Sequence, residues 1–205
     1  MRARSGLHVV LALAMTVVAG TEASAHRTED YLQAARIDVE PDRIQITLDL
    51  TPGTAVAESF IAAIDRDGDG SLSAAEQRTY ARQMVSALQV ELDGRSLHTN
   101  VRASCFPEAA AVRRGEGSVR LDIEATVPDL SPGSHRLLFR NAHLAGHSAY
   151  LANALVPESD RVAVTAQRRD RDQSELIIEY TMPGGSAAAS LAGILSRLTA
   201  ALRLP

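Results

Sequence analysis

Residues 65–76 read D-R-D-G-D-G-S-L-S-A-A-E. Aspartates stand at the first, third and fifth positions, glycine stands at the sixth, and glutamate closes the stretch at the twelfth. Apolar residues recur at helical spacing on both sides of it, and they are Val56, Phe60, Ile61 and Ile64 before it and Tyr80, Met84, Val85 and Leu88 after it. The pattern predicts two amphipathic helices joined by a tightly turned acidic loop.

The loop carries the oxygen ligands that a hard divalent cation such as Ca²⁺ prefers. The glycine at the sixth position permits the sharp turn, and the serine at the ninth can hold a bridging water. The expected ligands are Asp65, Asp67, Asp69, Ser71 through its backbone carbonyl, and Glu76 through both carboxylate oxygens. An acidic run with glycines is also typical of a solvated loop, but the order of residue types favours calcium.

At every motif position this stretch resembles the EF-hand family, which implies a calcium site between two helices. In paired EF-hands the apolar residue at the eighth position, here Leu72, makes a short strand contact with a partner loop. No second loop of this kind occurs in the sequence. We therefore expect one hand carried on another scaffold rather than a calmodulin-like body.

The scaffold is expected to be mainly β, because apolar and polar residues alternate with period two on both sides of the hairpin. Turn signals such as Asp93-Gly94 and Pro132-Gly133 separate the alternating runs. The expected strands lie near residues 37–39, 44–50, 90–92, 97–103, 119–127, 136–140, 162–166 and 176–180. This favours an antiparallel, Ig-like β-sandwich over residues 26–182, with the EF-hand inserted at 53–88.

The first 25 residues have the composition of a secretory signal peptide. Two arginines precede an apolar run from Leu7 to Val18, and Ala23-Ser24-Ala25 forms a small-x-small cleavage pattern. A membrane anchor needs about 20 apolar residues, and this run is shorter. We expect a mature start at His26 and a periplasmic or secreted protein.

Residues 183–205 form the expected linker and C-terminal amphipathic helix. Leu191, Ile194, Leu195, Leu198 and Leu202 fall on one helical face, and two arginines argue against a membrane span. The helix either docks on the core or attaches flexibly, or its apolar face contacts a membrane or an envelope protein partner.

Charge and cysteine content limit the remaining possibilities. The net charge of −4 makes nucleic acid an unexpected partner. Cys105 is the only cysteine, so no intrachain disulfide can form. It is expected to be a small buried apolar residue, with a free thiol as the alternative.

A second hypothesis concerns transition metals. A mature N-terminal His26 can offer an α-amino group and an imidazole to copper, nickel or cobalt. His98, His135, His143 and His147 are the other histidines of the mature chain, and the last two would share a face if their segment were helical.

The chain also resembles, more weakly, the soluble N-terminal region of bacterial nickel/cobalt-exporter-like membrane proteins. The resemblance rests on Ala25-His26, the strand pair around residues 44–50, the acidic loop, the hairpin at 88–95 and Phe139-Arg140-Asn141. It implies a periplasmic carrier or sensor of copper, nickel or cobalt. Arg27 stands where that family tends to have proline.

Enzyme motifs are lacking in the sequence. There is no Gly-x-Ser-x-Gly elbow, His-Glu-x-x-His, phosphate-binding glycine loop or Cys-x-x-Cys. A hydrolase with dispersed triad residues is the remaining catalytic alternative, because triads are set by geometry rather than spacing. The sequence therefore favours a calcium-binding protein without catalysis.

Overall fold

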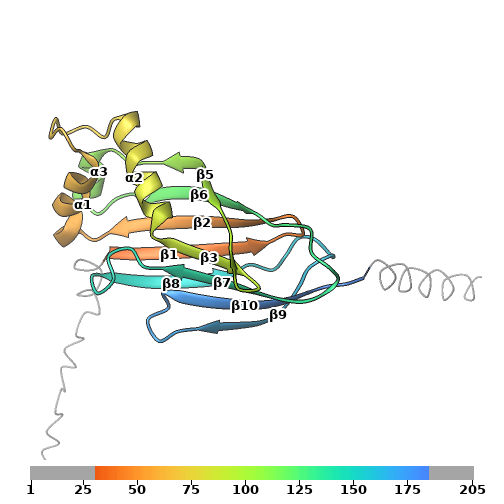
Figure 1. Cartoon of the computed structure of the whole chain (residues 1–205). Coiled ribbons are helices and arrows are strands. Elements are labelled where there is room, and N and C mark those ends of the chain that lie inside the picture. The colour runs from red at the N-terminus through yellow and green to blue at the C-terminus, as the bar shows by residue number, and fades with distance from the viewer. Residues whose placement is uncertain (1–30, 185–205) are drawn as a thin grey trace, which may run out of the picture.

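The computed structural model describes residues 31–184, which fold mainly into two five-stranded sheets (Figure 1). In spatial order the first sheet contains β5 (Thr99–Cys105), β6 (Val119–Thr126), β2 (Arg43–Pro52), β1 (Tyr31–Val39) and β8 (Ser148–Ala154). The second contains β4 (Arg95–Ser96), β3 (Leu88–Leu92), β7 (Gly133–Asn141), β10 (Glu175–Met182) and β9 (Ala163–Arg169). The helices are η2 (Thr54–Val56), α1 (Ala57–Ile64), α2 (Ala74–Ser86) and α3 (Ala109–Arg113).

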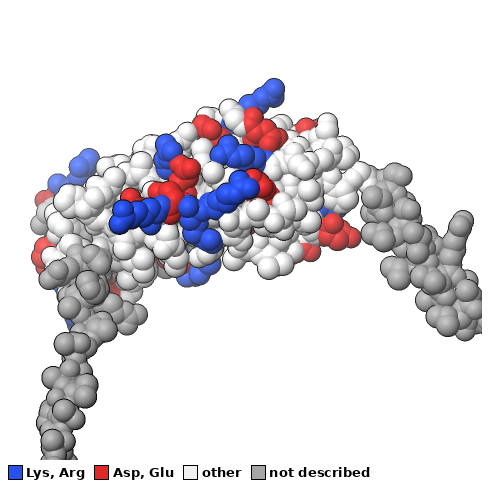
Figure 2. All heavy atoms as spheres, turned by 90° about the horizontal axis from the view of Figure 1, so that it is seen from below, with Lys and Arg blue, Asp and Glu red and all other residues white. Residues whose placement is uncertain are grey.

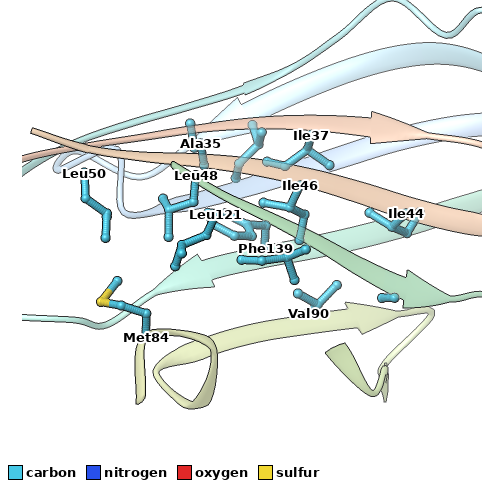
Figure 3. Close-up of a cluster of buried hydrophobic side chains, with 14 of the residues drawn as sticks. Ala35, Ile37, Ile44, Ile46, Leu48, Leu50, Met84, Val90, Leu121 and Phe139 are labelled. Carbon is cyan, nitrogen blue, oxygen red and sulfur yellow. The ribbon is translucent and has the colours of Figure 1, made fainter. Parts of the chain in front are cut away.

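Alternation with period two places one face of each central strand in a shared core. Every second residue of β2 from Ile44 onward is buried, and β10 follows the same pattern. Figure 3 shows Ile46 and Leu121 of the first sheet close to Phe139 of the second. Each such side chain contributes roughly 1.5–3 kcal/mol when removed from water. The expected mainly β, two-sheet architecture is confirmed, and it is consistent with a β-sandwich.

The outer face of the first sheet carries charged residues in matched positions. Asp49 accepts hydrogen bonds from Arg36 at 2.9 Å and from Arg120 at 2.7 Å, one on each neighbouring strand. On the face seen in Figure 2, basic and acidic side chains are interspersed without an extended area of one sign. This interspersed charge provides no broad basic surface there for a nucleic acid.

The expectation of a purely antiparallel arrangement is wrong at one pair of strands. β1 pairs with β8 in parallel, with Tyr31 opposite Ser148 and Ile37 opposite Ala154. β8 itself was not expected, because its sequence S-A-Y-L-A-N-A has neither β-branched residues nor clear alternation. Pairing with β1, and not local preference, makes this segment a strand.

The free edge of β8 is covered by side chains of β9. Arg169 Nε donates to the Ala152 carbonyl oxygen at 2.7 Å, and the Ala154 amide donates to Gln167 Oε1 at 3.1 Å. Backbone groups that would otherwise be open to another strand are thereby occupied.

The helices lie together at one end of the sheets (Figure 1). The segment between β2 and β3 contains α1 and α2. Phe60, Ile61 and Ile64 of α1 are buried, and so are Tyr80 and Met84 of α2. The apolar spacing around the acidic loop thus predicted both helices and most of their buried residues. Val56 instead lies in η2, Leu88 begins β3, and Val85 is only partly buried.

Cys105 is exposed, so the expectation of a buried cysteine is wrong. It ends β5, which lies at the edge of its sheet, where the outward side chain has no neighbouring layer. The expected signal peptide, His26 and the tail from 185 onward lie outside the described residues. Within residues 31–184, no helix is long and apolar enough to cross a bilayer.

Candidate metal centre

The acidic loop joins α1 to α2, and both of its ends are fixed by helix-capping hydrogen bonds. The Asp65 amide donates to the Ile61 carbonyl at 2.8 Å, which ends α1. Ser73 is the N-cap of α2, and it forms a capping box with Glu76. The two acids at the ends of the loop are therefore held by the helices that precede and follow it.

Three carboxylates of the loop converge. One oxygen each from Asp65, Asp67 and Glu76 lie within 4.8 Å of one another. Asp69 is not part of this cluster, and its Oδ1 accepts a hydrogen bond from the Ser71 amide at 2.7 Å. Of the four expected carboxylate ligands, the structure thus brings three together and holds the fourth in a turn within the same loop.

Backbone amides orient these carboxylates. The amides of Gly68 and Gly70 donate to the two oxygens of Asp65 at 2.7 and 2.9 Å, and the Arg66 amide donates to Glu76 Oε1 at 2.6 Å. Gly70 has φ of +83°, a left-handed conformation that side chains rarely adopt. The tight turn expected from the sixth position is therefore present.

Hydrogen bonds within the loop favour the charged form of Glu76. The Ser73 hydroxyl, followed by the amides of Arg66 and Ser73, lowers the pKa of Glu76 to about 2. No salt bridge among the described residues involves an acid of the loop. The nearby Arg113 pairs with Glu58 at 2.8 Å. The charge of Arg113 also acts on Asp65, but it forms no salt bridge with the loop. Clustered carboxylates without salt bridges favour a bound cation.

Leu72, at the eighth position of the loop, packs against other parts of the chain. Leu72 is partly buried against the core and lines a surface groove together with Phe106 and Pro107. The Gln77 side chain donates to the Leu72 carbonyl at 2.7 Å. The sequence patterns did not single out this segment before α3, which borders the loop through the groove.

The histidines do not form a second cluster of metal ligands within residues 31–184. His135 is held by Asp93, whose Oδ2 lies 2.7 Å from its Nδ1, while its Nε2 lies 2.9 Å from the Ser131 carbonyl. His143 and His147 lie in the turns after β7 rather than on a helix, and both line one cavity. The acidic loop supplies the only group of three acid, histidine or cysteine ligands found there.

Comparisons with known proteins add no family assignment. No protein-family model matches the chain, and a search of curated proteins found no match. The function therefore has to be argued from the geometry of the site.

Proposed function

We propose that this protein binds Ca²⁺ through a single EF-hand formed by α1, the 65–76 loop and α2, carried on an Ig-like β-sandwich. The observation that supports this most directly is the convergence of Asp65, Asp67 and Glu76 within 4.8 Å. Three hard oxygen donors that form no salt bridge among the described residues match the ligands that calcium takes. Ser71 and Asp69 complete the proposed ligand set from the same loop.

The proposed role of the ion is structural. Asp65 directly follows α1 and Glu76 lies in the first turn of α2, so an ion shared between them ties the two helices together. Ca²⁺ also removes the mutual repulsion of the clustered carboxylates. No catalytic step is part of the proposal.

The expected affinity is weak, because a single hand in a calcium-rich compartment belongs with extracellular modules, whose dissociation constants are about 10⁻⁴ to 10⁻³ M. At a few millimolar calcium, such a site adds on the order of 1 kcal/mol to the stability of the folded chain by mass action. We propose export to the periplasm or the medium on the basis of the N-terminal sequence, together with a membrane or envelope protein partner.

The test is calcium calorimetry on the chain beginning at residue 26. The Asp67→Asn, Glu76→Gln double variant removes two of the converging carboxylates while keeping their size. Asp129→Asn, Asp172→Asn is a matched control, because both residues are exposed acids outside the loop. We expect wild-type and control proteins to bind one calcium ion and the loop variant to bind none. Equal heats for the two variants would reject the proposal.

The rival hypothesis of copper, nickel or cobalt binding depends on His26, which lies outside the described residues. Titration of the same samples with copper and nickel separates the hypotheses. Binding that requires residue 26 and survives in the loop variant would favour the carrier or sensor role.

A further inference from the structure

A cavity of about 330 Å³ lies beside the helical hairpin, outside the calcium loop. Its walls come from four separate parts of the chain, namely the start of β1, α1, α2 and the turns after β7. Cavities that bind small molecules range upward from about 300 Å³, so this one matches a molecule built on a single ring.

Packed aromatic side chains form one wall of the cavity. The ring centres of Tyr31 and Phe60 lie 5.4 Å apart, and those of Phe60 and Tyr80 lie 5.7 Å apart. The hydroxyl oxygens of Tyr31 and Tyr80 are within hydrogen-bond distance at 3.1 Å. All three side chains are buried, so the wall exists before any ligand arrives.

The polar side chains that line the cavity are hydroxyl, amide and imidazole groups. Among residues 31–184, no aspartate, glutamate or arginine lines it. Burial lowers the pKa of His143, so its imidazole is uncharged at neutral pH. Its Nε2 is shut off from water and has no hydrogen-bond partner in the described part of the chain.

We propose that this cavity is a binding site for a small neutral molecule with an aromatic ring and a hydroxyl or N–H group. The aromatic wall contacts the ring, and the exposed side chains of Ser59, Gln83 and His147, which line the same cavity, offer hydrogen bonds to the polar group. A charged ligand is disfavoured, because it would lose water without meeting an opposite charge.

The residues just before Tyr31 are the competing occupant, since Tyr31 itself lines the cavity. They read H-R-T-E-D at 26–30 and so carry three charged side chains in five residues. That composition matches the neutral, aromatic lining poorly, and it favours a separate small molecule.

The cavity shares its walls with the calcium hairpin. Phe60 and Ala63 lie on α1 and Tyr80 lies on α2, the helices that Asp65 and Glu76 would join through the ion. This linkage, which rests on the proposed calcium binding, makes calcium and the small molecule bind more tightly together than apart. Each would then change the affinity of the other by the same factor.

The test is ligand-observed NMR with phenol and indole as neutral probes, and with benzoate and benzylammonium as charged ones. Ala63→Phe fills the mouth of the cavity from an exposed helical position. Ala62→Phe is the matched control, since it is the neighbouring exposed residue of α1 but does not line the cavity. We expect both neutral probes to bind wild type, Ala62→Phe to bind alike, and Ala63→Phe to bind at least tenfold more weakly.

Three outcomes would contradict the proposed binding site. They are no binding of either neutral probe, equal weakening by the two phenylalanine variants, and charged probes that bind as well as phenol. Binding that appears only after residues 26–30 are removed would assign the cavity to the chain's own N-terminal segment instead.

Repeating the phenol titration with calcium and with chelator separates the two proposals. Equal phenol affinities in a protein that binds calcium would reject the linkage alone. Phenol binding in a protein that binds no calcium would reject the EF-hand proposal and leave the cavity site standing.

Discussion

The contact between Asp93 and His135 makes stability depend on pH in a defined direction. Both ring nitrogens of His135 face acceptors, Asp93 Oδ2 at 2.7 Å and the Ser131 carbonyl at 2.9 Å, so only the protonated ring satisfies both. Burial by itself lowers the pKa of His135, but the bonds to Asp93 and Ser131 outweigh it and raise the pKa. Burial of Asp93 acts to raise its pKa, and His135 and the Arg136 amide outweigh it and lower the pKa.

The two shifts define a window of pH. The contribution of His135 is complete below its unfolded pKa of about 6.5 and is lost as pH rises through the higher folded value. The contribution of Asp93 is complete above its unfolded pKa of about 3.9 and is lost as pH falls through the lower folded value. The pair therefore stabilises the fold most between about pH 4 and 6.5.

The magnitude follows from exposure. The His135 side chain is 10% exposed, but that of Asp93 is 44% exposed, so solvent screens the pair. Hydrogen bonds to charged groups contribute about 1.5–3 kcal/mol when sheltered, and we expect about 1 kcal/mol here. In urea unfolding, the His135→Gln substitution should thus lower the free energy of unfolding by about 1 kcal/mol more at pH 5.5 than at pH 9.

The control for this measurement is His98→Gln, which changes an exposed histidine without a hydrogen-bond partner in the described residues. Its loss of stability should be the same at both pH values. If the two glutamine variants lose stability in parallel across the range, the reasoning from the Asp93 contact is refuted.

Three further predictions concern the hairpin, its support and the free thiol. Calcium at a few millimolar should raise the melting temperature of wild type but not of Asp67→Asn, Glu76→Gln, and a rise in both would place the bound ion elsewhere. Gly115→Ala should lower the free energy of unfolding by about 1–3 kcal/mol, because Gly115 has φ of +71° and the new Cβ would lie 2.9 Å from Thr54 Cγ2. Urea unfolding measures this loss, and an unchanged midpoint would contradict the prediction. Cys105 is exposed, so it should react with a thiol reagent in the native protein as fast as after unfolding, and protection in the native state would show it to be covered.

Sequence patterns predicted the elements whose information is local. β6 alternates through Val119, Leu121, Ile123 and Ala125, and all four are buried. The helices beside the loop follow from apolar spacing in the same way. The three converging carboxylates were also predicted, because positions one, three and twelve of one short loop are brought together by local turns.

Elements that depend on distant pairing were missed. β8 has a weak strand sequence, and its pairing with residues 31–37 is set by the tertiary fold. The exposure of Cys105 was also missed. The sequence does not indicate that the strand that carries it lies at the edge of a sheet. The cavity could not be predicted either, since Tyr31, Phe60, Tyr80 and His143 come from four separate segments.

The parallel pairing of β1 with β8 has a kinetic consequence. Tyr31 and Ser148 are far apart in the sequence, so β1 can pair with β8 only after most of the chain has been synthesised. Such long-range pairing is expected to form late in folding. Until then β1 has one row of unpaired backbone groups, which is the kind of edge that recruits other strands. Chains that end before residue 148 lack β8, β9 and β10, so they should associate with one another through the open edges of both sheets.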